Sequence, residues 1–173
     1  MAKLAFLGLG VMGYPMAGHL KKGGHEVTVY NRSSAKAEAW VKEHGGKMAA
    51  TPAAAAHDAD IVFCCVGADQ DLYAVTTGAD GAFSGMRAGS IFVDNTTASA
   101  EAAITLDTAA RELGLHMIDA PVSGGQAGAE NGKLTVMCGG EADIFDKAMP
   151  IISCYAAKVI LVGASGSGQL TKM

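Results

Sequence analysis

Aromatic residues, basic clusters and long hydrophobic runs are all scarce in this chain of 173 residues. Phe, Trp and Tyr make up 6% of the sequence, and the net charge is -4. Glycine or a charged residue interrupts each apolar run before it reaches the roughly 18 residues that a membrane-spanning helix needs. These absences argue against a membrane protein and against nucleic acid or an anionic membrane as partner. We therefore expect a soluble cytoplasmic protein that binds a small molecule.

The cysteines and histidines show no pattern typical of a disulfide framework or a metal site. The four cysteines form no CxxC pair, and Cys64 and Cys65 are adjacent in a run typical of a buried strand. The five histidines are scattered and lack the i, i+4 spacing and the glutamate of a helical zinc site. We expect reduced, structural thiols and no metal.

Glycine and small apolar residues are abundant, and strand-like segments alternate with helix-like ones. Strands connected through helices need right-handed crossovers, which give a mostly parallel sheet covered on both faces. The pattern therefore predicts one α/β domain with a doubly wound sheet. The expected strands are Lys3–Leu7, Glu26–Tyr30, Asp60–Val66, Ser90–Asp94, His116–Asp119, Leu134–Cys138 and Val159–Val162. The expected helices are Val11–Leu20, Ala35–His44, one beginning at Thr51 and Pro52, Ser99–Leu113 and Glu141–Ser153.

The end of the chain has a different pattern. Residues 163–168 are all Gly, Ala or Ser, and Gln169–Met173 has the sequence of a first helical turn. A helix of so few residues is unstable alone. We predict a domain over residues 1–164 and the start of a helix over 165–173, in a protein that continues beyond Met173.

A G-x-G-x-x-G motif lies between the first expected strand and the first expected helix. In such a motif the first glycine permits a tight turn, the second lets the backbone approach a pyrophosphate, and the third allows close helix–strand packing. The phosphates then lie at the amino end of the helix. In this context we predict dinucleotide binding, with a purely structural glycine turn as the alternative. The residues concerned are Gly8, Leu9, Gly10, Val11, Met12 and Gly13.

The end of the second expected strand indicates which dinucleotide is bound. An NAD site usually has Asp or Glu there to bind the adenosine ribose, but this chain has Asn31, Arg32 and Ser33. Arg32 can form a charge-assisted pair with a 2′-phosphate, which a carboxylate would repel. We therefore expect NADP as cofactor, with NAD as second choice. The alternative is a solvated surface arginine.

A third motif, Asp119–Gly125 (DAPVSGG), follows another expected strand. Consecutive glycines can expose successive backbone N–H groups as a small concavity that binds anions. We predict that Ser123, Gly124 and Gly125 bind the carboxylate of a small substrate.

Four segments together carry a resemblance to the β-hydroxyacid dehydrogenases, the family of 3-hydroxyisobutyrate dehydrogenase and tartronate semialdehyde reductase. They are Phe6–Ala17 (FLGLGVMGYPMA), Asp94–Thr97 (DNTT), Asp119–Gly125 (DAPVSGG) and Gly166–Lys172 (GSGQLTK). The resemblance spans the whole chain. It implies a Rossmann-type cofactor domain and an NAD(P)-dependent oxidoreductase that interconverts a short β-hydroxy acid and its semialdehyde.

The resemblance also implies roles for individual residues. Lys172 would be the acid/base, and Thr97 would approach the nicotinamide side of the cofactor. Val66 and Gly67 would pass beside the cofactor, and Ser123–Gly125 would hold the substrate carboxylate. Asn31 and Arg32 resemble the members that use NADP.

The family continues beyond this lysine with an asparagine, a long inter-domain helix and an all-helical domain that completes the pocket and dimerises. We therefore expect a larger parent protein that is a homodimer or homotetramer, and a piece that alone binds cofactor weakly and has no turnover. Two other interpretations are an imine reductase, which usually replaces the lysine, and a non-catalytic dinucleotide-binding module. Lys172 favours the dehydrogenase.

Overall fold

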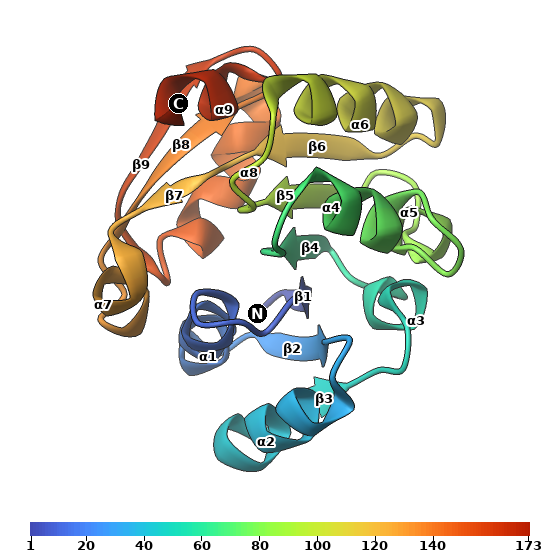
Figure 1. Ribbon diagram of the computed structural model, residues 1–173, viewed down its shortest axis with the longest axis vertical. Coiled ribbons are helices and arrows are strands. Elements are labelled where there is room, and N and C mark those ends of the chain that lie inside the picture. The colour runs from blue at the N-terminus through green and yellow to red at the C-terminus, as the bar shows by residue number, and fades with distance from the viewer.

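A nine-stranded sheet runs through the centre of the computed structural model, which describes residues 1–173, and helices cover both faces of this sheet (Figure 1). The strands are β1 (Lys3–Leu7), β2 (Glu26–Tyr30), β3 (Lys47–Met48), β4 (Ile61–Cys64), β5 (Ile91–Asp94), β6 (His116–Asp119), β7 (Val122–Ser123), β8 (Leu134–Gly139) and β9 (Ala156–Gly163). The helices are α1 (Gly13–Lys22), α2 (Ser34–His44), α3 (Pro52–Ala56), α4 (Asp69–Thr76), α5 (Ala82–Gly85), α6 (Ala100–Glu112), α7 (Gly125–Glu130), α8 (Ala142–Ile152) and α9 (Ser167–Lys172).

The strand order is β3-β2-β1-β4-β5-β6-β8-β7, with β9 paired to β8. Strands β1 to β6 are all parallel to one another, whereas β8 runs antiparallel to β6 and β7. The first six strands therefore have the 3-2-1-4-5-6 order of a Rossmann sheet. The predicted mostly parallel, doubly wound α/β fold is confirmed.

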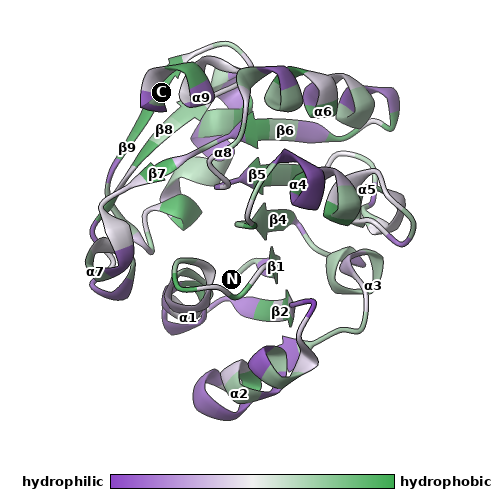
Figure 2. Cartoon of the chain, in the orientation of Figure 1, coloured by the Kyte–Doolittle hydropathy of each residue, from purple (hydrophilic) through white to green (hydrophobic).

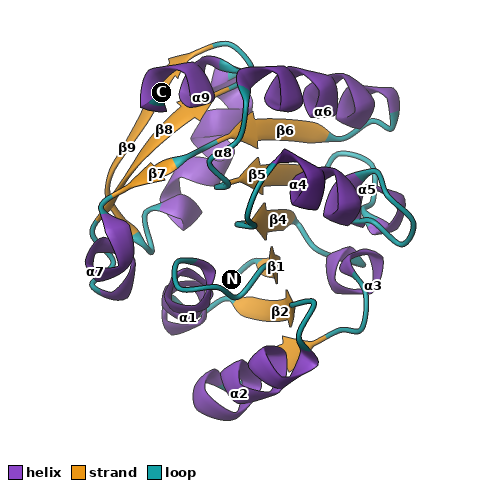
Figure 3. Cartoon of the chain, in the orientation of Figure 1, coloured by secondary structure: helices purple, strands orange, loops and turns teal.

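Alternate side chains of each strand point to opposite faces and enter two separate hydrophobic clusters. Phe6, for example, belongs to a cluster of 26 buried residues, and its neighbour Leu7 to a cluster of 16. Helices α1, α2, α7 and α8 cover the first cluster, and α3 to α6 cover the second. Figure 3 shows α1, α7 and α8 on one side of the strands and α3, α4 and α5 on the other. Hydrophobic residues lie in the central strands, and hydrophilic ones on outer helices such as α2 (Figure 2).

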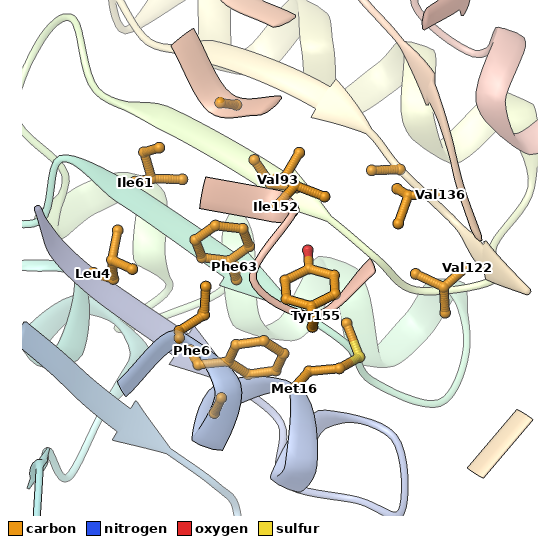
Figure 4. Packing of buried hydrophobic residues seen from close by; sticks show 14 of the residues in the cluster. Leu4, Phe6, Met16, Ile61, Phe63, Val93, Val122, Val136, Ile152 and Tyr155 are labelled. Carbon is orange, nitrogen blue, oxygen red and sulfur yellow. The ribbon is translucent and has the colours of Figure 1, made fainter. Parts of the chain in front are cut away.

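Tyr155 links the larger cluster to a polar loop. Its ring is fully buried and packs edge-on against Phe63, with 6.1 Å between the ring centroids (Figure 4). Its hydroxyl donates a hydrogen bond of 2.9 Å to Oδ1 of Asn95, whose Nδ2 donates to the carbonyl of Ala120 at 2.8 Å. The hydrophobic core therefore fixes the loop that follows β5.

The expected elements are present, with some shifted ends. Helix α1 begins at Gly13 and not at Val11, because residues 9–12 form the turn that leads into the helix. Sequence patterning missed β3, β7, α4, α5 and α7. The first two contain two residues each, α5 contains four, α7 contains two glycines, and α4 has a mixed composition without a clear apolar stripe, so none carries a strong periodic signal.

The last helix, α9, has more support than its length indicates. It packs against α6, β6, β8 and β9. Tertiary contacts therefore hold a helix of six residues that would be unstable alone.

Candidate functional site

The packing of the turn between β1 and α1 explains why its sequence contains glycines. Gly8 has φ +97°, and a Cβ atom there would lie 2.2 Å from the carbonyl oxygen of Cys65. A Cβ at Gly13 would lie 2.0 Å from the carbonyl oxygen of Gly8. A Cβ at Gly10, in contrast, would meet nothing within 4 Å. Packing therefore requires the first and third glycines, whereas Gly10 faces open space that a ligand can occupy.

A cleft of about 640 Å³ opens beside this turn, at the carboxyl ends of β1, β2 and β4. The connections on the two sides of β1 cross opposite faces of the sheet, and this switch point is where open α/β sheets bind ligands. Ten residues predicted to contact a cofactor line the cleft, namely Gly8, Leu9, Gly10, Val11, Met12, Gly13, Asn31, Arg32, Val66 and Gly67. The structure thus brings together three separate segments of the chain.

Asn31 has a structural role in this cleft. Its Oδ1 accepts a hydrogen bond from the backbone N–H of Leu9 at 2.9 Å, and its Nδ2 donates to the carbonyl of Ser33 at 3.1 Å. Asn31 therefore ties the glycine turn to the segment after β2. A side chain that orients the turn is a contribution that the sequence analysis did not anticipate.

Arg32 and Ser33 are both exposed, and only Arg32 lines the cleft. The five ion pairs of the structure involve other residues, so the Arg32 guanidinium has no carboxylate partner within the chain. Ser33 precedes α2, but its side chain makes no capping hydrogen bond to that helix. The open cleft at Gly10 fits a bound dinucleotide, and the guanidinium of Arg32 is free to contact it.

The opposite wall of the cleft is formed by residues that sequence reasoning missed. Most of them come from the segments around α3 and α4, where the sequence predicted a helix start at Thr51 and Pro52 but no binding site, and the other two, Tyr30 and Cys65, adjoin residues that were predicted. Asp71, on α4, is half-buried and lies close to Gly67, where an added Cβ would be 2.8 Å from its carboxylate oxygen. The missed residues are Tyr30, Ala50, Thr51, Pro52, Cys65, Asp71, Ala74, Val75, Ala79 and Asp80.

The loops after β4 and β5 are joined side by side. The backbone N–H of Val66 donates to Oγ1 of the buried Thr96 at 3.0 Å. Nearby, Ser99 donates to Asp69 through its hydroxyl at 2.6 Å and its backbone N–H at 2.9 Å. Thr97 is exposed and lines a separate, shallow depression together with Leu170 of α9 and Met173. The structure therefore places Thr97 next to α9 and outside the main cleft.

The remaining predicted residues lie on two other elements. Lys172 is half-buried and is the last residue of α9, whose Gln169 accepts a hydrogen bond from Ala98 on the loop that carries Thr97. Ser123 ends β7, and Gly124 and Gly125, with φ +133° and +62°, lead into α7. Helix α7 packs against α1, whereas α9 packs against α6. Neither group lines the cleft around the glycine turn.

Buried carboxylates lie behind the loops. Asp94 and Asp119 are paired in register at the ends of β5 and β6, and both are buried. Burial raises the pKa of Asp94 to about 7, against hydrogen bonds from Thr96 that lower it, and the charge of Asp119 raises it further. Burial also raises the pKa of Asp119, and hydrogen bonds from the backbone of Gly166 and Gln169 oppose that rise. Oδ2 of Asp94 has no hydrogen-bond partner.

Comparison with known proteins identifies the domain. Residues 3–163 match the family described as the NAD binding domain of 6-phosphogluconate dehydrogenase. The chain belongs to this family. An uncharacterized oxidoreductase of Shewanella frigidimarina is 58% identical over 173 residues, which are 100% of this chain and 60% of that protein. The NAD-dependent L-serine dehydrogenase of Pseudomonas aeruginosa is 35% identical over 100% of this chain and 58% of its own length.

Solved structures give the same assignment. The 3-hydroxyisobutyrate dehydrogenase of Mycobacterium tuberculosis with L-serine superposes with a TM-score of 0.94 at 32% identity, over 99% of this chain and 58% of that one. This member of the 6-phosphogluconate dehydrogenase NAD-binding family thus spans about 60% of the length of its relatives. It is an NAD(P)-binding domain of the β-hydroxyacid dehydrogenase-like oxidoreductases, and the resemblance found in the sequence is confirmed.

Two further properties of the chain bear on its chemistry. No group of three or more His, Cys, Asp or Glu side chains is arranged to hold a metal ion. None of the helices has the length and apolar character needed to cross a bilayer.

The glycines of the turn allow binding and folding to be separated by experiment. Gly13→Ala should lower the free energy of unfolding by about 2 kcal/mol or more, because the new Cβ overlaps the carbonyl oxygen of Gly8. Gly10→Ala should change stability by less than about 0.5 kcal/mol but weaken dinucleotide binding at least tenfold, because its Cβ occupies the open cleft. Urea unfolding followed by fluorescence of the buried Trp40, with calorimetric titration of NADPH, measures both effects. Equal losses of stability in the two variants would contradict this division.

Asp94 should make the stability of the domain depend on pH. The folded carboxyl keeps its proton up to a pH of about 7, whereas an unperturbed one loses it near 3.8. Its contribution to stability is therefore complete below pH 3.8 and is lost as the pH rises through about 7. Asp94→Asn, which keeps an acceptor for Thr96, should stabilise the protein at pH 8 relative to wild type by about 1 to 4 kcal/mol, and the advantage should disappear toward pH 4. Asp146→Asn, at an exposed position of α8, controls for the loss of one carboxylate, and parallel pH profiles of wild type and Asp94→Asn would contradict the expectation.

Proposed function

We propose that the protein carrying this chain is an NADP-preferring oxidoreductase that interconverts a short β-hydroxy acid and its semialdehyde, with Lys172 as the acid/base. The observation that carries the proposal is the arrangement of the loops. Val66, which lines the dinucleotide cleft, donates a hydrogen bond to Thr96 on the loop that also carries Thr97. Helix α9, which carries Lys172, packs beside the same loop. Cofactor and proton-transferring group are therefore held by one connected part of the fold.

The reaction divides between cofactor and protein. A bound nicotinamide supplies or accepts the hydride. Lys172 takes the proton from the hydroxyl of the alcohol, and in the reverse direction gives a proton to the developing alkoxide. Lys172 is half-buried at the end of α9, so part of the residue is open to solvent. Thr97, exposed beside α9, would contact the nicotinamide side of the cofactor.

We assign the substrate carboxylate to Ser123, Gly124 and Gly125. These residues connect β7 to α7, and Gly124 and Gly125, both with positive φ, have no side chain that would block their backbone N–H groups. The relatives named above include an L-serine dehydrogenase and a 3-hydroxyisobutyrate dehydrogenase solved with L-serine. L-serine and 3-hydroxyisobutyrate are both short acids with a hydroxyl on the β-carbon, which is the substrate class we propose.

The preference for NADP rests on Arg32. Its exposed guanidinium lines the cleft without an ion-pair partner, and the end of β2 lacks the carboxylate that would bind the ribose of NAD. Because the Pseudomonas relative is described as NAD-dependent, relatives do not all share this preference, and we assign it to the present chain from Arg32.

Reversal of the charge at Arg32 tests the cofactor assignment. Arg32→Asp should invert the preference from NADP to NAD, because the change removes a charge-assisted pair with the 2′-phosphate and adds a repulsion. Each tenfold change in the ratio of the two dissociation constants corresponds to about 1.4 kcal/mol. Lys42→Asp, at the far end of α2, controls for the change in net charge. Equal affinity of the unmutated protein for both cofactors would end this assignment.

Removal of Lys172 tests the reaction itself. In the complete protein, Lys172→Ala should leave the dissociation constant of NADPH nearly unchanged and lower kcat by roughly 10² to 10⁴, the usual contribution of a positioned acid/base group. Initial rates with short hydroxy acids and semialdehydes measure the loss, with Lys158→Ala on the exposed face of β9 as control. Wild-type turnover by the Lys172 variant would contradict the proposal, and reduction of cyclic imines in place of semialdehydes would favour an imine reductase.

A further inference from the structure

Gln169 is a buried polar residue for which neither the glycine motif nor the acid/base assignment has a use. It lies on α9, and only 1% of its surface is exposed. Both ends of its amide are bonded to the backbone of the loop after β5. Oε1 accepts from the N–H of Ala98 at 3.1 Å, and Nε2 donates to the carbonyl of Thr96 at 2.7 Å. A buried amide that is satisfied at both ends fixes two segments relative to each other.

The start of α9 is fixed to the sheet by a second polar group. The carboxylate of Asp119, at the end of β6, accepts from the N–H of Gly166 at 2.8 Å and from the N–H of Gln169 at 3.1 Å. A Cβ on Gly168 would lie 2.4 Å from the carbonyl oxygen of Met137, so the glycine lets the helix rest directly on the backbone of β8. Helix α9 is thus held at its first turn by Asp119 and at its middle by Gln169.

The loop to which Gln169 is hydrogen-bonded is also bonded to one wall of the dinucleotide cleft. The hydroxyl of Thr96 accepts from the N–H of Val66, which lines the cleft, and the carbonyl of Thr96 accepts from Gln169. The contacts therefore run from Val66 through Thr96 to Gln169, three residues before Lys172. Residues separated by three lie on neighbouring parts of a helix surface, so a shift of Gln169 moves Lys172 with it.

We propose that Gln169 is a positioning residue that couples the wall of the cofactor cleft to Lys172 and so holds the acid/base nitrogen in register with the bound dinucleotide. The inference rests on the proposed function of Lys172. It assigns Gln169 no contact with substrate or cofactor. Its effect on turnover is exerted entirely through the position of α9.

The test uses three variants of the complete protein. Gln169→Leu removes both hydrogen bonds at similar volume, and Gln169→Glu keeps the acceptor but, when ionised, places a second oxygen against the carbonyl of Thr96. Thr171→Val is the matched control, because the exposed Thr171 bonds only within α9, to the carbonyl of Ser167 at 2.8 Å. Gln169→Leu should lower kcat roughly 10- to 100-fold, the loss expected when a reacting group is misplaced by about an ångström. The dissociation constant of NADPH should change less than about twofold, and Thr171→Val should behave as wild type.

A dependence on pH separates positioning from general damage. Protonated glutamic acid is isosteric with glutamine and donates where the amide did, and burial favours this neutral form. The ratio of kcat for Gln169→Glu to that of wild type should therefore rise as the pH falls, whereas the ratio for Gln169→Leu should stay low. If Gln169→Leu fails to fold, Gln169→Glu alone decides, because a ratio that is constant with pH contradicts the proposal.

A double-mutant cycle distinguishes failure of this inference from failure of the proposed function. In a Lys172→Ala background, Gln169→Leu should lower kcat no further, because the group through which it acts is gone. Full additivity would overturn the positioning role and leave the role of Lys172 intact. If Lys172→Ala keeps wild-type turnover, the proposed function fails, and hydrogen exchange then decides the structural part. Exchange of the α9 amides should accelerate at least tenfold in Gln169→Leu without change in β1 to β5, and unchanged exchange would overturn the coupling as well.

Discussion

The close approach of three backbone segments at the glycine turn is the constraint on which the rest of this domain depends. Gly8 lies against the carbonyl of Cys65, and Gly13 lies against the carbonyl of Gly8, at distances that exclude any side chain. The end of β1, the end of β4 and the start of α1 are thereby brought to one point. Because those strands occupy the switch point of the sheet, the same packing that seats α1 on the sheet also opens the dinucleotide cleft.

The other end of the site depends on side chains and not on glycine packing. Three buried residues, Thr96, Gln169 and Asp119, are each hydrogen-bonded to the backbone of another segment, and together they join the loops after β4 and β5, helix α9 and the end of β6. Asn95 adds a fourth tie from this region to the hydrophobic core through Tyr155. Buried polar groups whose bonds are all made give a loop a single conformation, which suits a site that aligns two reactants.

Charge is distributed in keeping with this division. At the outer end of the cleft an exposed arginine faces solvent, where a phosphate can meet it. Behind the loops, Asp94 and Asp119 are removed from water, and burial raises the pKa of both carboxyls. The hydrogen bonds from α9 compensate Asp119, whereas Oδ2 of Asp94 has no partner. Burial of these two carboxyls is therefore unfavourable. The hydrogen bonds to Asp119 offset part of this cost and also hold the start of α9 against the sheet.

The sequence by itself determined the alternation of strands and helices, the glycine turn and the family, because these depend on local periodicity and on residues close together in the chain. It indicated most of one wall of the cleft, since Gly8–Gly13, Asn31 and Arg32 belong to contiguous motifs. It did not reveal the opposite wall around Thr51 and Asp71, because the helix start at Thr51 carries no sign of the cleft that it lines and α4 has no periodic signal. Only the tertiary structure decided that α9 is a stable element, since the groups that hold it, Asp119 and the backbone of Thr96 and Ala98, lie 47 to 73 residues away along the chain. Local propensity carries no information about hydrogen bonds between residues so far apart.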